Sequence, residues 1–305
     1  MTDYKNLIDG KMVDNGEWLE VLNPATEQVV GRVPSCGKEE LDSAVAAARR
    51  AFTQWKKTTA EERQQVVQGI AAAIKENADE LYRLLTSEQG KPHAQAQQEI
   101  YGAAGLAAAQ STLTLDDVIN QDDDTRLSRT RRVPVGVVGG IVPWNFPIMM
   151  AIQKIVPALV AGCTIVLKPS PFTPLTTLRV AELIKDVVPA GTVNIITGED
   201  TLGPLITEHP DIDKITFTGS TATGKKIMEG ASGDLKRITL ELGGNDASIV
   251  LPDADVQKVA EQLFWSSFSN AGQVCIAAKR IYIHEYIYDD LSKAIADYAK
   301  TVVSG

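Results

Sequence analysis

The sequence has no long apolar run and no excess of positive charge, and each lack excludes a class of protein. No apolar stretch approaches the roughly 20 residues that span a bilayer, and the N-terminus has neither the basic start nor the apolar core of a signal peptide. The formal net charge of -9 argues against a surface that follows nucleic-acid phosphates, because Lys and Arg clusters carry such binding. We therefore expect a cytoplasmic protein that binds neither a membrane nor a nucleic acid.

Cysteine and histidine are also scarce. The cysteines are Cys36, Cys163 and Cys275, and their odd number and wide spacing exclude a disulfide framework and a C-x-x-C metal site, so we expect no metal. Cys163 opens an apolar run and Cys36 lies in a turn, which predicts a core residue and a turn residue. No histidine is positioned to pair with Cys275, so a protease-type hydrolase is poorly supported.

Apolar residues make up 44% of the chain and charged residues 23%, which is typical of a globular protein with room for two domains. Two short strands joined by a turn are expected at 6–13 and 17–24. Helical spacing of apolar residues then predicts three helices, with N-caps at Ser35 and Thr59 and a stop for the second helix at Gly90. These helices are expected at 39–57, 60–90 and 94–113.

After Arg132 the pattern changes to short apolar runs that alternate with segments of helical period. This alternation predicts an α/β fold in which a parallel sheet, buried on both faces, is covered by helices on both sides. In such sheets, ligands bind at the carboxyl ends of the strands. The strands are expected at 135–143, 163–169, 192–198, 213–219 and 237–244, with a later pair at 247–252 and 277–285. Just before the first of them, an acidic run at 116–125 meets a basic run at 128–134, which predicts a solvated face or a subunit contact.

Polar residues at these strand ends are the candidate site. Asn145 lies between two prolines and is either a turn residue or an amide that donates to a developing oxyanion. Lys168 is either solvated or bound to ligand hydroxyls and phosphates. The turn from Gly219 to Gly224 precedes a helix whose free N–H groups could bind a phosphate, although it matches neither common nucleotide fingerprint.

Two further candidates lie later in the chain, the carboxylate of Glu241 and the thiol of Cys275. Glu241 ends an apolar strand before two glycines, where burial would raise its pKa and suit it to act as a general base, unless it is a carboxylate paired with Lys or Arg. Cys275 follows an N-cap-like stretch, residues 269–274, and precedes a strand. It is interpreted as a thiol that attacks an electrophilic carbon near a carboxylate and a nucleotide site.

In combination, these motifs resemble the aldehyde dehydrogenase superfamily. "PWNFP" with Asn145, "LKPS" with Lys168, "FTGSTATG", "LELGG" with Glu241 and "GQVC" with Cys275 occur in its order and at its spacing, over essentially the whole chain. The chain is similar to the hydrolytic branch, which does not acylate CoA. The resemblance implies a three-layer α/β/α dinucleotide-binding domain with the N-terminal helices at 1–242. The first part of a second α/β domain, the catalytic one, would follow at 243–305.

The resemblance also implies roles. Cys275 would form a thiohemiacetal and then a thioester with the aldehyde, Glu241 would activate the hydrolytic water, and Asn145 would hold the oxyanion together with the Cys275 N–H. Lys168 would bind the ribose hydroxyls of NAD and belongs to the catalytic set as well. NADP remains allowed, because Pro171 stands where many NAD-using relatives carry an acid. The residues implied to bind the cofactor are Ile141, Pro143, Trp144, Lys168, Ser170, Gly203, Gly219, Ser220, Gly224 and Leu242.

Family members continue well beyond residue 305, so we expect a truncated catalytic domain, and a homodimer or homotetramer for the full-length form. Met149, Met150, Trp265 and Ile276 favour an uncharged, apolar aldehyde as substrate. Two alternatives stay open. The chain could be an inactive dinucleotide-binding or assembly fragment of such an enzyme, or a thiol esterase that uses Cys275 and Glu241 without a cofactor.

Overall fold

The computed structural model describes residues 2–303 and divides the chain into two compact units, Met1–Glu241 and Leu242–Gly305. Each unit is described by itself. Among the described residues, none of the helices combines the length and the apolar character that a bilayer crossing requires. The assignment of the two units to cofactor binding and to catalysis stays a prediction.

The first unit is built on a seven-stranded sheet with the order β12-β11-β8-β9-β10-β2-β3. Its first five strands run parallel to one another and β2 pairs antiparallel with β10, so the α/β fold class is confirmed. The parallel strands are the five predicted from the apolar runs. The strands are β8 (Val137–Ile141), β9 (Thr164–Lys168), β10 (Val193–Ile195), β11 (Lys214–Thr218), β12 (Arg237–Glu241), β2 (Asn6–Ile8) and β3 (Lys11–Val13).

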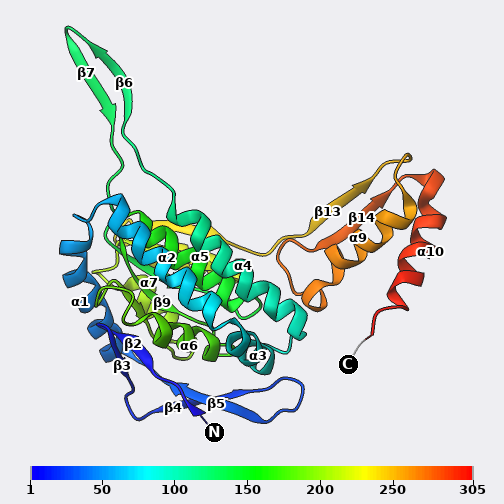
Figure 1. Cartoon of the computed structure of the whole chain (residues 1–305), viewed down its shortest axis with the longest axis horizontal. Coiled ribbons are helices and arrows are strands. Elements are labelled where there is room, and N and C mark those ends of the chain that lie inside the picture. Colours follow the sequence, from blue (N-terminus) through cyan, green and yellow to red (C-terminus); the bar gives the residue numbers. More distant parts are fainter. Residues whose placement is uncertain (1, 304–305) are drawn as a thin grey trace. The chain divides into compact units, whose positions relative to one another are not determined.

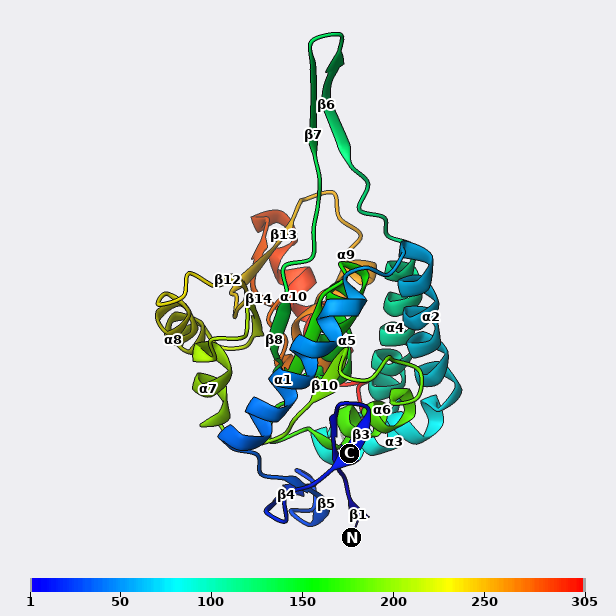
Figure 2. The same cartoon turned by 90° about the vertical axis from the view of Figure 1, so that its left-hand side faces the viewer.

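Helices cover both faces of this sheet. Figure 2 shows α1 and α7 on one side of the strands and α5, α6, α2 and α4 on the other. Gly139 of β8 lets a helix approach the sheet, because a Cβ there would lie 2.8 Å from Ile206 of α7. A Cβ at Gly140 would lie 2.8 Å from Leu167 of the neighbouring strand β9. The helices are α1 (Lys38–Trp55), α2 (Ala60–Glu76), α3 (Ala78–Gln89), α4 (His93–Ser111), α5 (Pro147–Val160), α6 (Leu175–Ile184), α7 (Leu202–Glu208) and α8 (Thr221–Ala231).

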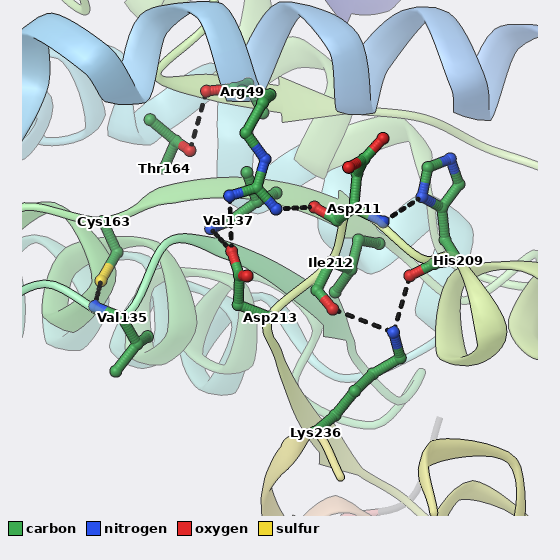
Figure 3. Close-up of polar contacts among 11 residues, drawn as sticks. Arg49, Val135, Val137, Cys163, Thr164, His209, Asp211, Ile212, Asp213 and Lys236 are labelled. Atoms are coloured by element: carbon green, nitrogen blue, oxygen red, sulfur yellow. Dashed lines mark hydrogen bonds and ion pairs between the residues drawn. The ribbon is translucent and has the colours of Figure 1, made fainter. Parts of the chain in front are cut away.

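A polar network fixes the amino ends of β8 and β11 (Figure 3). The Asp213 carboxylate accepts hydrogen bonds from the Val137 N–H at 2.7 Å and pairs with Arg49 at 2.9 Å. Gly136 lies at φ 129°, where a Cβ would collide with that carboxylate, so glycine is required there. Lys236 donates to the carbonyls of His209 and Ile212 at 2.7 and 3.0 Å. The network therefore fixes β8 and β11 at their amino ends, opposite to the carboxyl ends where the candidate site is predicted.

The helices before the sheet differ in part from the expectation. Thr59 caps α2 with a capping box, and Gly90, in the left-handed conformation, ends α3, as predicted. The single helix predicted at 60–90 is wrong, because Asn77 leaves the helical region at φ -107° and ψ 18° and separates α2 from α3. Its side chain donates back to the carbonyl of Ala73 at 2.8 Å. Ser35 is not an N-cap, since α1 begins after Gly37.

The N-terminal strands and the charged segment are hairpins. The segment 6–13, predicted as one strand, folds into β2 and β3 around Asp9 and Gly10, both at positive φ. The strand predicted at 17–24 joins a separate small sheet, formed by β1 (Thr2–Asp3), β5 (Val29–Pro34) and β4 (Trp18–Leu22). The charged segment forms β6 (Val118–Asp123) and β7 (Arg126–Thr130), a largely exposed hairpin that projects from the first unit (Figure 1). Both predicted roles of this segment, a solvated face and a subunit contact, stay predictions.

The second unit packs two helices on a pair of parallel strands. Its buried core is small and consists of Val250, Ala260, Leu263 and Leu291. Ile249 and Tyr282 are paired in register on adjacent strands, and both are exposed, at 75% and 54%. The elements are β13 (Asp246–Val250), α9 (Val256–Phe268), β14 (Ala278–Ile283) and α10 (Tyr288–Ala299), and the two strands lie close to the predicted ones.

Candidate active site

A cleft of about 780 Å³ opens at the carboxyl ends of β8, β9 and β11 in the first unit. This is the edge of a parallel sheet where ligands bind in α/β proteins. Most of the residues predicted to bind a cofactor line this one cleft, although they come from four separate stretches of the chain. They are Ile141, Pro143, Trp144, Lys168, Ser170, Gly203, Gly219 and Ser220.

Lys168 presents a buried cation to the cleft. The residue ends the fully buried strand β9 and is only 3% exposed. Among the described residues, its Nζ makes one hydrogen bond, a long one of 3.5 Å to the carbonyl of Pro169. Burial lowers the pKa of Lys168 to about 8, and the negative charge of Asp200, another residue that lines the cleft, opposes this shift. A buried ammonium with so little hydrogen bonding can still donate to hydroxyl or phosphate oxygens.

The loop from β11 to α8 forms another wall. Ser220 caps α8 by accepting from the N–H of Thr223 at 3.1 Å, so the first helical turn begins at the cleft with its N–H groups and its positive dipole end. A Cβ at Gly219 would lie 2.4 Å from the ring of Phe217, so a larger residue would displace that ring. Gly224 is buried within α8 and does not line the cleft. The predicted phosphate-binding turn is therefore supported through Gly219 and Ser220.

Asn145 lies beside the cleft rather than in its wall. It is half-buried in the loop between β8 and α5, directly after Trp144, which lines the cleft. Its side-chain oxygen accepts from the N–H of Phe146 at 3.1 Å. The side-chain oxygen is therefore held by the backbone of the next residue.

Glu241 ends β12, and the expectation that it is buried is wrong. β12 is the edge strand of the sheet and alternates exposed and half-buried residues, with Glu241 on the exposed side. Its backbone is nonetheless fixed, because its carbonyl accepts from the N–H of Gly219 at 3.0 Å. Exposure leaves the carboxylate accessible to water. Leu242, the last predicted cofactor residue, begins the second unit and is half-buried.

Lys154 was missed by the sequence interpretation. It lies on α5, is 6% exposed, and its Nζ donates to the hydroxyls of Thr218 and Thr216 at 2.8 and 3.3 Å. Burial lowers the pKa of Lys154 to about 8, while the negative charge of Glu241 opposes that shift. The position of Lys154 among apolar helix residues could have indicated a buried cation. Its hydrogen-bond partners could not be predicted, because they lie on a strand more than 60 residues further along the chain.

Cys275 lies in the second unit, on the loop between α9 and β14. The preceding stretch is not an N-cap, as no helix begins there; instead a short 3-10 turn, Ser269–Gly272, follows the end of α9. Asn270 and Ala271 both take left-handed conformations, at φ 51° and 56°, which is unfavourable for alanine. A Cβ at Gly244, also in the second unit, would lie 2.9 Å from the Cys275 carbonyl, so Gly244 packs closely on this loop.

The three cysteines differ in accessibility. Cys163 is 2% exposed and Cys36 is 6% exposed, and burial raises the pKa of the Cys36 thiol to about 12. Both are therefore structural, as predicted for Cys163 and for the turn residue Cys36. Cys275 is free and exposed. It is the thiol of the three that a substrate could reach.

The sequence matches the model of the aldehyde dehydrogenase family over residues 12–305. The chain belongs to the aldehyde dehydrogenase family. The resemblance inferred from the five motifs is thereby confirmed. A probable aldehyde dehydrogenase of Pseudomonas is 44% identical over 98% of this chain. The NADP-dependent succinate-semialdehyde dehydrogenase GabD of Escherichia coli is 41% identical over 95% of it.

Solved structures of family members have the same fold. The NAD complex of the aldehyde dehydrogenase from Bacillus cereus superimposes with a TM-score of 0.95 at 38% identity, and covers 99% of this chain and 63% of that one. The NAD-dependent enzyme from Sinorhizobium meliloti gives a TM-score of 0.95 at 38% identity, covering 100% and 62%. The chain also spans only 61% of the length of each of the two curated relatives, about three fifths.

Proposed function

We propose that the chain contributes to the oxidation of an aldehyde to a carboxylic acid with a nicotinamide dinucleotide as cofactor. The observation that carries the proposal is the cleft at the carboxyl ends of β8, β9 and β11, which gathers the predicted cofactor residues in a member of the aldehyde dehydrogenase family. The catalytic thiol would be Cys275, the exposed cysteine.

The cleft fits a dinucleotide in three respects. Its volume, about 780 Å³, lies in the range of cofactor sites. Lys168 offers ammonium donors suited to ribose hydroxyls, and the start of α8 offers N–H groups suited to a pyrophosphate. Trp144 and Phe172 supply exposed aromatic surface. Ser170, Gly203 and Ile141 would complete the contacts, with Pro143, Gly224 and Leu242 shaping the segments around them.

Cys275, Asn145 and Glu241 would each act in a different step of the reaction. The Cys275 thiolate adds to the aldehyde carbon and gives a thiohemiacetal, whose oxyanion accepts hydrogen bonds from the Asn145 amide and the Cys275 N–H. The nicotinamide cofactor, when bound, supplies the acceptor for the hydride that this carbon loses. Water then attacks the thioester on Cys275, Glu241 takes a proton from that water, and the thiolate leaves as the acid is released.

NAD is the first choice of cofactor, and NADP remains allowed. Pro171 lines the cleft where an acid would repel a 2'-phosphate, and Lys226 of α8 also lines it. The relatives are divided: GabD is named as NADP-dependent, and the Sinorhizobium enzyme as NAD-dependent. The positive charge of Lys226 and the lack of an acid at position 171 would both allow the 2'-phosphate of NADP to bind.

The substrate is proposed only as an aldehyde. Related proteins are named for succinate semialdehyde and glutarate semialdehyde, which carry a carboxylate. The apolar residues Met149, Met150, Trp265 and Ile276 favour an uncharged aldehyde instead. A panel containing both semialdehydes and uncharged aliphatic and aromatic aldehydes, each with NAD and with NADP, separates these possibilities by the absorbance of the reduced cofactor.

The nucleophile is tested with Cys275→Ala. We expect turnover to fall by about a thousandfold or more while cofactor binding is kept, because the thiol is needed only for the covalent step. Cys163→Ala, at a buried cysteine, is the matched control and should keep its turnover. Normal aldehyde oxidation by Cys275→Ala would contradict the proposal.

A second candidate is an inactive dinucleotide-binding or assembly fragment. It is favoured by the exposed apolar face of the second unit, which includes Ile249 and Tyr282. This candidate predicts cofactor binding without any aldehyde-dependent reduction by the chain. A cofactor-independent thiol esterase predicts ester hydrolysis without aldehyde oxidation. For the complete protein we propose a homodimer or homotetramer, to be measured by light scattering.

A further inference from the structure

A charged pair is completely buried beneath the loop that carries Asn145. Lys91, just after the end of α3, and Glu99 of α4 bind each other directly, and both side chains are 0% exposed. Burying two charges is unfavourable, and an apolar pair of similar size is often as stable. A pair at this depth therefore calls for an explanation beyond stability.

Glu99 fixes the start of α5. One carboxylate oxygen binds Lys91, and the other accepts from the N–H groups of Ile148 and Met149 at 3.0 and 3.2 Å. These are among the free N–H groups of the first helical turn, where a negative charge is also favoured by the helix dipole. The helix that begins directly after the Asn145 loop is thus held by α4.

Lys91 fixes the loop itself. Its ammonium donates to the carbonyl of Asn145 at 2.8 Å and lies 4.0 Å from the centre of the Phe146 ring. Nearby, Thr173 donates to the carbonyl of Trp144 at 3.3 Å. Two consecutive carbonyls of the loop are therefore held by side chains from other segments.

We infer that Lys91 and Glu99 are positioning residues that hold the segment Pro143–Met149 in place. The pair would set both the wall of the cleft at Pro143 and Trp144 and the direction of the Asn145 amide. Lys91 would act on the loop and Glu99 on the helix, and their mutual bond would couple the two. The inference about Asn145 rests on the proposed function, whereas the inference about the loop does not.

Paired variants separate positioning from stability. Lys91→Met and Glu99→Gln each leave one buried charge without its partner, so each is expected to lower the melting temperature. The double variant Lys91→Met/Glu99→Gln buries no charge and should melt close to the unchanged chain. It still lacks the donor to the Asn145 carbonyl. The matched control is Lys185→Met/Asp186→Asn, which removes a pair with an exposed acid at 2.8 Å in the same unit.

The readouts are amide hydrogen exchange of residues 144–149 and the affinity for NAD measured by calorimetry. In the double variant we expect these amides to exchange about tenfold faster than in the unchanged chain, with β9 and β10 unaffected, because the loop opens locally. We expect the affinity for NAD to fall about fivefold, since Pro143 and Trp144 line the cleft. The control pair should change neither quantity.

Several results would overturn the inference. Unchanged exchange of 144–149 in the double variant would mean that the pair only stabilises the fold, and faster exchange throughout the unit would exclude a local role. Unchanged affinity for NAD, despite a loosened loop, would remove the link to the cleft. If the unchanged chain does not bind NAD, the proposed function fails, and the exchange comparison alone still decides the positioning role.

Discussion

The two units of the chain differ in how completely they bury their apolar surface. The first unit encloses its central parallel strands, β8, β9 and β10, between two layers of helices, and its core includes fully buried side chains such as Ile152 and Leu159. The second has a small core, with Leu291 at its centre, and leaves Ile249 and Tyr282 exposed. Parallel strands are normally covered on both faces. The first unit thus has the packing of a self-sufficient domain, whereas the second does not.

The largest expected difference concerns the cores. Ile152→Ala should lower the free energy of unfolding of the first unit by about 2–5 kcal/mol, since it leaves a cavity among fully buried neighbours. Leu291→Ala should affect only the weaker transition of the second unit. Urea unfolding followed by hydrogen exchange of peptides from each unit measures both. A single transition that both substitutions shift equally would show that the units are not independent.

A buried carboxylate gives the first unit a pH dependence of its own. Burial raises the pKa of Glu88 to about 7, while its bonds to the N–H groups of Leu175 and Thr176 oppose the shift. Because the folded state holds its proton more tightly than the unfolded state, whose pKa is near 4.5, this contribution to stability is full below pH 4.5 and is lost as the pH rises to 7.

The expected loss is at most about 3 kcal/mol over that window. Glu88→Gln, which keeps the size and a carbonyl acceptor, should remove it. The measurement is the difference in urea stability between pH 4.5 and pH 7.5 for the two proteins. Parallel pH profiles would show that Glu88 is charged throughout and is stabilised by the start of α6.

Thiol labelling gives the smallest effect and compares the units directly. Cys275 of the second unit is exposed, and Cys36 and Cys163 of the first are buried. Iodoacetamide should modify Cys275 at least about tenfold faster than the other two, because reaction needs an accessible thiolate. Peptide mass spectrometry follows each site. Equal rates at all three cysteines in the folded chain would contradict the closed core of the first unit.

Much of the fold could be predicted from the sequence. The strands β8 to β11 were found because their β-branched apolar runs are buried, and the turn at Gly219 because it separates a strand from a helix. The hairpin of β6 and β7 was missed, since exposed strands show no alternation of burial. The break at Asn77 was missed because apolar residues keep their helical spacing across it. The buried state of Lys154, and the pairing of Lys91 with Glu99, arise from tertiary contacts that sequence spacing does not encode.

The most direct test of the account is a calorimetric titration of the chain with NAD and with NADP, compared with Lys168→Met. If the cleft of the first unit is the dinucleotide site, the unchanged chain should bind one cofactor. Lys168→Met, which removes the buried ammonium at the cleft but keeps the length of the side chain, should bind it at least about tenfold more weakly. Lys185→Met, outside the cleft, should bind as the unchanged chain does. No binding of either cofactor, or equal affinity in Lys168→Met, would contradict the account.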